Sequence, residues 1–305
     1  MASTTTVTLG GLIDDTLEVL YRSTEHPFQL TVGSDALADG TDTTLTVSDA
    51  ARLKGTDIIE LADEMVLVTA KSSDATPVLT VARGYAGTTA ASSGHPTGTV
   101  ALINPPWPRS SMSTYVQRCF KSLMNSQLPS VTSAVKNRAT GLQYVEMPAD
   151  TMRVLSLRHM ITTTGRIADI GGWQFEQDLP STVVSTGKAL RVTSSIVDAD
   201  DLIVTYQTPY TFTGSGEAAT VSVPLGTEDI PVLWAAAYAV TRREVSRVDV
   251  AKIEEWNQTV AMQQGVNLRW ARELWGEVYR RVDEAKSMLA LPKHRPFRKM
   301  PHLVR

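Results

Sequence analysis

The sequence predicts an α+β protein in which helices flank an inserted small β module, followed by a second antiparallel β sheet and a C-terminal helical region with an extended basic tail. Three observations predict this class. Short β-rich runs separated by turn residues fill two regions of the chain. Apolar residues at intervals of three and four mark helices before, between and after them. The predicted parts are an N-terminal helix over 1–27, an inserted all-β module over 28–104, a core helix over 105–130, an antiparallel β region over 131–226, C-terminal helices over 227–291 and an extended basic arm over 292–305.

The first helix is expected over residues 11–26, with Asp14 and Asp15 in its first turn, where the helix dipole favours acidic side chains. Pro27 ends it. The runs FQLTV, TTLTV, MVLVTA, PVLTVA and GTVALI then predict an all-β module of about five strands, because each is short, β-branched and bounded by turn residues.

Three prolines, Pro105, Pro106 and Pro108, close the module, since none can extend a ladder or lie inside a helix. Serines at 110, 111 and 113 are suited to cap the helix that follows. Residues 142–225 are again β-rich, with the runs LQYVEMP, TMRVLSLRHMI, WQFEQ, ALRVTS and DLIVTYQTPY, and they predict a second antiparallel sheet or sandwich.

The remaining chain predicts helices. Pro231 marks a helix start, and Gly265 a break between two helical segments. The apolar spacing predicts a helical core, and an aromatic platform for stacking bases is the less favoured interpretation of the same residues. The predicted helical core consists of Trp234, Tyr238, Leu274 and Val278.

The composition is that of a soluble globular protein, with 42% apolar and 20% charged residues among 305. The single cysteine, Cys119, excludes a disulfide within the chain and a cysteine-rich metal site. The first fifteen residues lack the pattern of a signal peptide, and the longest apolar run, IPVLWAAAYAV, is too short to cross a bilayer. We therefore expect a protein made in a cytoplasm, with no membrane partner.

The net charge of −3 hides an asymmetry. Residues 1–100 hold 13 acids and 5 bases, whereas residues 241–305 hold 14 bases and 8 acids. Opposite charge at the two ends favours a molecule that meets different neighbours at each end, and chance placement on a solvated surface is the alternative.

No catalytic, cofactor or metal motif is complete. None of the five histidines lies in an HExxH pattern, and the segment STGKAL lacks the first glycine and the final Ser/Thr of a phosphate loop. The acidic segment Asp198–Asp201 lacks the glycine and distal glutamate of a calcium loop, so it is interpreted as a β-turn. The sequence thus predicts no enzyme, no cofactor and no metal site.

The stretch VARGYAGTTAASSGHPTGTVAL resembles a turn-and-strand pattern that recurs in structural proteins of tailed bacteriophages, in which an R-G-x-x-G-T turn is followed by a histidine and a G-T strand start. Gly84 and Gly87 permit a turn with positive φ, and the strand from Thr99 returns to the sheet. The matching residues are Arg83, Gly84, Gly87, Thr88, Ala90, His95, Gly98, Thr99 and Val100. The order helix, β insertion, helix, β sheet and terminal helices is similar to that of a head-to-tail adaptor (connector) protein of such phages.

The resemblance implies a structural virion protein at the head-to-tail junction, assembled as a homo-oligomeric ring of about twelve copies beneath the portal protein. It implies a distal neck or tail protein as second partner and viral DNA passing through without tight binding. Candidate lumen residues are Asp198, Asp200 and Asp201, because an acidic surface does not hold phosphates. The arm suits docking to the portal, with a free tail as the alternative, and its candidate docking residues are Lys293, Arg295, Phe297, Arg298, Lys299, Leu303 and Arg305.

Three other functions stay open from the sequence. One is another virion role, as a tail completion, tail-terminator or decoration protein. The second is a nucleic-acid-binding module that acts through the basic C-terminus, although no fold signature of a base-reading element is present. The third is a phage tail hydrolase, which would need an acidic pair in a cleft.

Overall fold

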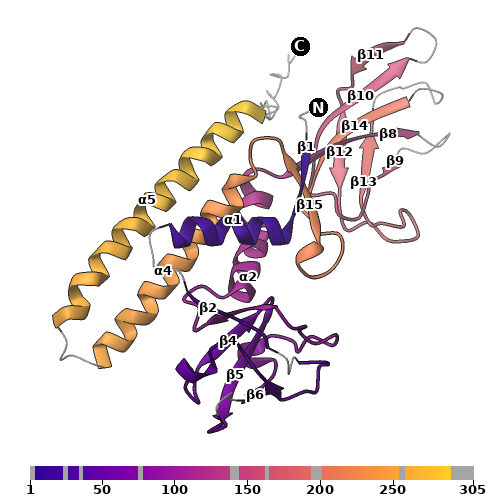
Figure 1. Cartoon of the computed structure of the whole chain (residues 1–305). Coiled ribbons are helices and arrows are strands. Elements are labelled where there is room, and N and C mark those ends of the chain that lie inside the picture. The colour runs from indigo at the N-terminus through magenta and orange to yellow at the C-terminus, as the bar shows by residue number, and fades with distance from the viewer. Residues whose placement is uncertain are drawn as a thin grey trace, which may run out of the picture. The chain divides into compact units, whose positions relative to one another are not determined.

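The structure is a computed structural model in which antiparallel sheets and helices confirm the α+β class (Figure 1). It describes residues 4–22, 27–33, 37–74, 78–137, 144–161, 165–193, 201–253 and 258–289, with side chains except at 51, 137, 161, 244–253 and 258–268. The chain divides into two compact units. The first unit comprises residues 1–8, 119–231 and 277–305, and the second comprises 9–118 and 232–276.

The second unit contains the predicted β module as a six-stranded antiparallel sheet with the order β2-β7-β4-β5-β6-β3. The sequence predicted about five strands; the additional strand is β4, whose residues IIEL lie between two of the predicted runs, TTLTV and MVLVTA. The strands are β2 (Phe28–Thr31), β3 (Thr44–Leu45), β4 (Ile58–Leu61), β5 (Glu64–Lys71), β6 (Leu79–Ala82) and β7 (Val100–Ile103), with 3-10 turns at Ala50–Arg52 and Tyr85–Gly87.

The two edge strands of this sheet meet, so that the sheet closes on itself as a small barrel. Val32, after β2, bridges Val47, after β3, and the Gly33 N–H donates to Thr46 O at 2.7 Å. Closure removes the open edges that a flat sheet would expose. Alternate residues of the strands fill the interior, where Leu45, Ile59 and Leu61 are fully buried.

Helix α1 (Leu9–Tyr21) precedes the barrel and buries one face through Leu12, Ile13, Leu17 and Leu20. It begins two residues earlier than predicted. The prediction that Asp14 and Asp15 occupy its first turn is therefore wrong, because that turn holds no acidic residue.

Helix α2 (Arg109–Cys119) follows the barrel and continues through a π-helical turn (Phe120–Met124) into α3 (Asn125–Gln127). A π-turn inserts one residue and so changes the direction of the side chains that follow it. In the first unit, Phe120 makes edge contacts with Tyr210 and Phe212, at ring-centre distances of 5.4 and 5.1 Å. The Tyr210 hydroxyl donates to Leu128 O at 2.7 Å, which fixes the end of this helical segment.

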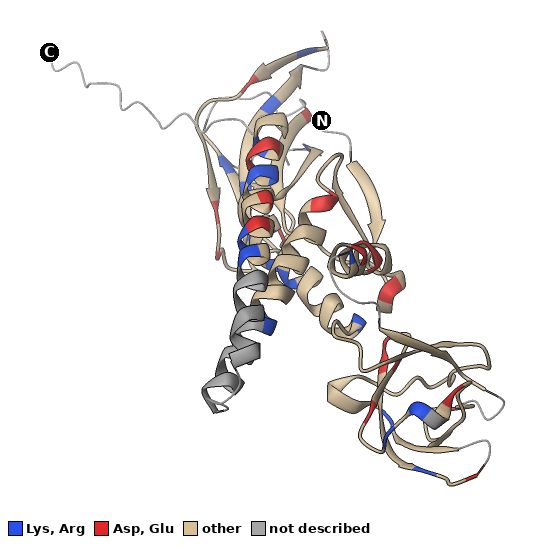
Figure 2. Ribbon diagram, turned by 60° about the vertical axis from the view of Figure 1, so that its left-hand side comes forward, with Lys and Arg blue, Asp and Glu red and all other residues tan. Residues whose placement is uncertain are grey.

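Helices α4 (Asp229–Ile253) and α5 (Gln258–Leu289) form the C-terminal helical region. Pro231 lies in the first turn of α4, as predicted. The predicted break at Gly265 is wrong, because α5 runs through this position. Along the C-terminal part of α5, basic and acidic residues alternate, and Arg280 pairs with both Glu277 and Glu284 (Figure 2).

Besides a two-stranded sheet, the first unit contains two larger antiparallel sheets, with the orders β11-β10-β14-β8 and β12-β13-β9. They share a core that includes Val154, Leu157, Leu190 and Leu202. The sequence missed β8, β11 and β15. The strands are β8 (Ser130–Asn137), β9 (Tyr144–Glu146), β10 (Arg153–Ile161), β11 (Arg166–Asp169), β12 (Trp173–Glu176), β13 (Ala189–Val192), β14 (Asp201–Thr208) and β15 (Thr220–Pro224), with a 3-10 turn at Gly216–Ala218.

Strand β1 (Thr4–Thr8) pairs antiparallel with β15, with Thr6 opposite Ser222. The prediction of helix alone over residues 1–27 is therefore corrected, because the threonine-rich start is a strand. The β-branched threonines suit a strand that is exposed on one side.

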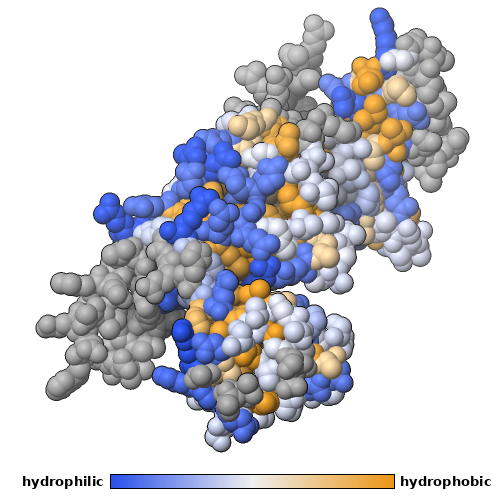
Figure 3. Space-filling model, in the orientation of Figure 1, coloured by the Kyte–Doolittle hydropathy of each residue, from blue (hydrophilic) through white to orange (hydrophobic). Residues whose placement is uncertain are grey.

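The four-stranded sheet exposes apolar side chains on the face opposite the shared core. Val135 is 60% exposed and Ile167 54% exposed, and Val131 lies four residues from Val135 along β8, on the same face. Apolar atoms are visible at the surface over this region, where Figure 1 labels β10 and β11 (Figure 3).

Candidate functional site

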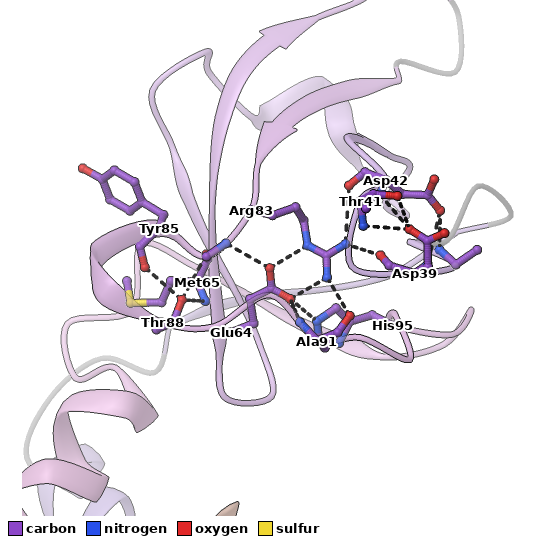
Figure 4. Close-up of polar contacts among 12 residues, drawn as sticks. Asp39, Thr41, Asp42, Glu64, Met65, Arg83, Tyr85, Thr88, Ala91 and His95 are labelled. Atoms are coloured by element: carbon purple, nitrogen blue, oxygen red, sulfur yellow. Dashed lines mark hydrogen bonds and ion pairs between the residues drawn. The ribbon is translucent and has the colours of Figure 1, made fainter.

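The residues of the phage-like pattern converge on one buried carboxylate, Glu64 at the start of β5 (Figure 4). Its side chain has no exposed surface. It accepts hydrogen bonds from Arg83 Nε at 2.6 Å and Arg83 Nη2 at 2.7 Å, and from the backbone N–H groups of Gly84 and Ala91 at 3.1 and 3.0 Å. His95 Nε2 lies 2.8 Å from Oε2. Because an ionised carboxylate can only accept, this ring nitrogen carries the proton.

Arg83 uses its remaining donors on backbone carbonyls. Nη1 donates to Asp39 O at 2.6 Å and Nη2 to Ala91 O at 3.3 Å, while the side chain is 6% exposed. The Asp39 carboxylate in turn accepts from the Thr41 N–H and hydroxyl, both at 2.7 Å. The planar guanidinium therefore joins the loop at 37–43 to the loop after β6, using its fork of donors.

Two glycines allow the chain to pass this cluster. Gly84 has φ of 62°, which places its N–H beside Glu64. At Gly94, with φ of 67°, an added Cβ would lie 1.9 Å from Leu37 O, so no other residue fits. The next residue, His95, donates its N–H to the same Leu37 O at 2.6 Å.

Thr88 of the pattern also has a structural partner. Its hydroxyl accepts from the Met65 N–H at 3.0 Å and donates to Tyr85 O at 2.9 Å. Gly87, in the same turn, has φ of 83°. The pattern is thus a set of residues that fold the barrel loops around Glu64.

The surroundings of Glu64 favour its ionised form. Burial by itself would raise the pKa, but the hydrogen bonds from Arg83, from the Ala91 N–H, from His95 and from the Gly84 N–H outweigh it and lower the pKa to about 2. The carboxylate therefore stays charged throughout the physiological range, where it holds its donors in place.

This lowered pKa predicts how the stability of the barrel depends on pH. Since the pKa lies below the ordinary value of 4.5, the ionised carboxylate contributes its full stabilisation above about pH 4.5. The contribution, about 3 kcal/mol, is lost as the pH falls towards 2. The free energies of unfolding of the parent and of Glu64→Gln, both measured in urea, should differ by a constant amount from pH 7 to 5. This difference should shrink below pH 4.5. A difference that stays constant down to pH 3 would contradict the prediction.

The predicted helical core is formed in part. Trp234 is 8% exposed, stacks on Tyr238 with 4.9 Å between ring centres, and meets the Trp275 edge at 5.9 Å. Leu274 and Val278 are buried, whereas Tyr238 is only half-buried. The burial of Trp234 leaves it unsuited to stack on a nucleic-acid base, in line with the core interpretation.

Other predicted residues lie outside the described part of the chain. They are Asp198 and Asp200 of the candidate lumen, and all seven docking residues of the arm, from Lys293 to Arg305. The third candidate lumen residue, Asp201, begins β14 opposite Asn137 and Met160 and is partly exposed.

Sequence reasoning missed Glu64. The sequence did contain a signal for it, because Glu64 directly precedes the apolar run MVLV. An acidic side chain in a buried strand requires hydrogen-bonding or oppositely charged partners. Sequence reasoning also missed two cation–π contacts. The Arg242 guanidinium lies 5.8 Å from the centre of the Tyr238 ring, and the Arg243 guanidinium lies 4.8 Å from the centre of the Trp107 ring.

Two further features bear on chemistry. The lone Cys119 is buried, and burial raises the pKa of its thiol far above the usual range, so it does not form the reactive thiolate. Among the described residues, no group of three or more His, Cys, Asp or Glu is placed to hold a metal ion. No helix within the described ranges combines the length and apolar character needed to span a membrane.

Comparison with known proteins identifies no relative: no family model, no curated protein and no solved structure matches this chain.

Proposed function

We propose that this protein is a structural virion protein of a tailed bacteriophage, a head-to-tail adaptor that forms a ring beneath the portal and extends the DNA channel towards the tail. The observation that carries the proposal is the barrel between α1 and α2. Its Arg83, Gly84, Thr88 and His95 match the phage-like pattern, and all of them bond within the barrel around Glu64. The pattern therefore marks a folded module inserted between helices, in the order expected of an adaptor.

The exposed face of the four-stranded sheet supports an assembling protein. Val131, Val135 and Ile167 are more than two-fifths exposed on that face. They lie on β8 and β11, the two edge strands of the sheet. Exposed apolar side chains of this kind suit contacts with another protein.

The proposal is tested by measuring the mass of the purified full-length protein, alone and mixed with the portal protein of the same phage. Mass photometry and negative-stain electron microscopy should show closed rings, either alone or seated on the portal. A monomer that stays monomeric with the portal would overturn the proposal. Binding of duplex DNA by that monomer would favour a nucleic-acid-binding module.

Deleting residues 292–305 is expected to leave the protein folded and to abolish docking to the portal. The three prolines of this segment are incompatible with a helix. Burial of the Phe297 and Leu303 side chains in the portal would stabilise docking by about 1.5–3 kcal/mol each. Exposed ion pairs contribute about 0–1 kcal/mol each, so Phe297→Ala should weaken docking more than Lys293→Ala. Co-sedimentation with the portal measures both effects. Equal docking by the truncated and full chains would show that the arm is a free tail.

A further inference from the structure

Strand β8 forms an open edge of the four-stranded sheet in the first unit. It is the last strand in the order β11-β10-β14-β8, and it pairs with β14 without a bulge from Ser130 to Asn137. In an antiparallel pair, the N–H and C=O groups of alternate residues point away from the partner strand. Within the part of the chain that the structure describes, no residue outside β14 bonds to the backbone of β8. A row of backbone donors and acceptors is therefore open at this edge.

The other edge strands of the larger sheets are protected, whereas β8 is not. Proteins usually block pairing at an edge by a short strand, by charged residues or by closure of the sheet. β11 has four residues and carries Arg166 and Asp169, β12 has four and carries Glu176, and β9 has three and carries Glu146. The edge strands of the barrel close on each other. β8 has eight residues, and its one charged residue, Lys136, lies near its C-terminal end.

Apolar side chains lie beside this edge on one face of the sheet. Val131 and Val135 are 42% and 60% exposed, and both point away from the core that the two larger sheets share. Val135 lies opposite Ile203 of β14, so the apolar surface continues onto the next strand. One more strand at this edge would bond to the open backbone groups and cover the valines at the same time. The edge of β8 is therefore a template for an extended segment of protein.

The sequence of β8 suits pairing with a second copy of the same strand. Valines lie two residues before and two residues after Ser133. Antiparallel pairing about this serine places Val131 of each copy opposite Val135 of the other, and apolar pairs across two strands stabilise a sheet. Lys136 lies opposite Ser130 of the second copy, so the two lysines do not oppose each other. The paired positions differ by an even number of residues, so outward-pointing backbone groups of one copy meet outward-pointing groups of the other.

We propose that β8 binds β8 of a second copy of this chain, antiparallel and about a two-fold axis at Ser133, so that two four-stranded sheets join into one. Such a contact is isologous, because each copy contributes the same surface. It goes beyond the adaptor function and does not depend on it. A ring with cyclic symmetry is held by heterologous contacts, whereas this two-fold contact joins two free chains or chains of two rings.

Cysteine cross-linking of the full-length protein tests this register. The only native cysteine, Cys119, is buried and unreactive, so a new thiol reports alone. In Ser133→Cys the two thiols meet at the axis, and mild oxidation should give covalent dimers on a non-reducing gel. The matched control is Val131→Cys, whose two copies lie about 13 Å apart along the strands, beyond the reach of a disulfide. It should cross-link at least tenfold more slowly. Equal cross-linking of the two variants, or none by Ser133→Cys, would overturn the proposal.

Charged substitutions in the Ser133→Cys background test the pairing of the valines. Val135→Lys should slow cross-linking at least tenfold, because it places a charge opposite an apolar side chain of the second copy. Adding Val131→Glu to the same chain places opposite charges across the contact and should restore cross-linking.

The matched control is Thr6→Lys, which adds the same charge to β1, an exposed edge strand without charged residues, and should stay within twofold. Far-UV circular dichroism establishes that each variant is folded. Loss of cross-linking in Thr6→Lys but not in Val135→Lys would assign the contact to β1 and overturn the proposal. Ring formation is measured separately by electron microscopy, so failure here is distinct from failure of the adaptor function.

Discussion

Replacing Glu64 by alanine is expected to lower the free energy of unfolding of the barrel by about 3–5 kcal/mol, the usual cost of breaking a buried ion pair from one side. The substitution leaves the Arg83 guanidinium, whose side chain is 6% exposed, without its carboxylate. It also removes the acceptor of the Gly84 and Ala91 N–H groups. Buried donors without an acceptor carry the full cost of their lost hydration.

Native-state hydrogen exchange measures this loss of stability separately for each strand. A local measurement is needed because the chain has two units, and a single free energy of unfolding does not describe both. The amides of β4 to β7 should exchange faster in Glu64→Ala, while those of β10 and β14 in the first unit keep their protection. Asp63→Ala is the matched control, because Asp63 is the adjacent acid and is exposed at the tip of the β4–β5 hairpin. Unchanged exchange in the barrel of Glu64→Ala would mean that the cluster does not stabilise the module.

Replacing Trp234 by alanine should also cost about 3–5 kcal/mol, the range for removing a large buried ring. The ring is 8% exposed, stacks on Tyr238 and meets the edge of Trp275, so its loss opens a cavity and removes two aromatic contacts. Urea unfolding followed by far-UV circular dichroism and hydrogen exchange of α4 give the measurement.

Trp234→Phe serves as the graded control and should lose less, because a smaller ring still fills part of the space. Met288→Ala removes a side chain that is 73% exposed and should change stability by less than about 0.5 kcal/mol. If Trp234→Ala unfolds like the parent, the packing described for α4 is wrong.

The portal-docking arm and all three lumen residues stay predictions. The arm, Asp198 and Asp200 lie outside the described residues, and the position of Asp201 at the start of β14 does not test its role. The barrel cluster could be predicted only in part. Arg83, Gly84, Gly87 and His95 were found through their spacing, but the spacing says nothing of the group on which they converge. That group, Glu64, precedes Arg83 by 19 residues and comes from another strand.

The sequence by itself determined the α+β class and the extent of the inserted module, from Phe28 at the start of β2 to Ile103 at the end of β7. Prolines, glycines and the spacing of apolar residues act on the backbone within a few residues, so the local sequence is enough to predict their effect. Tertiary structure alone decided the closure of the barrel, the place of β4, and the pairing of β1 with β15. The hydroxyls of Thr6 and Ser222, 216 residues apart, lie 3.3 Å from each other across that last pair. Such pairings depend on which strand edges and buried charges meet once the chain has folded, and no local pattern encodes that choice.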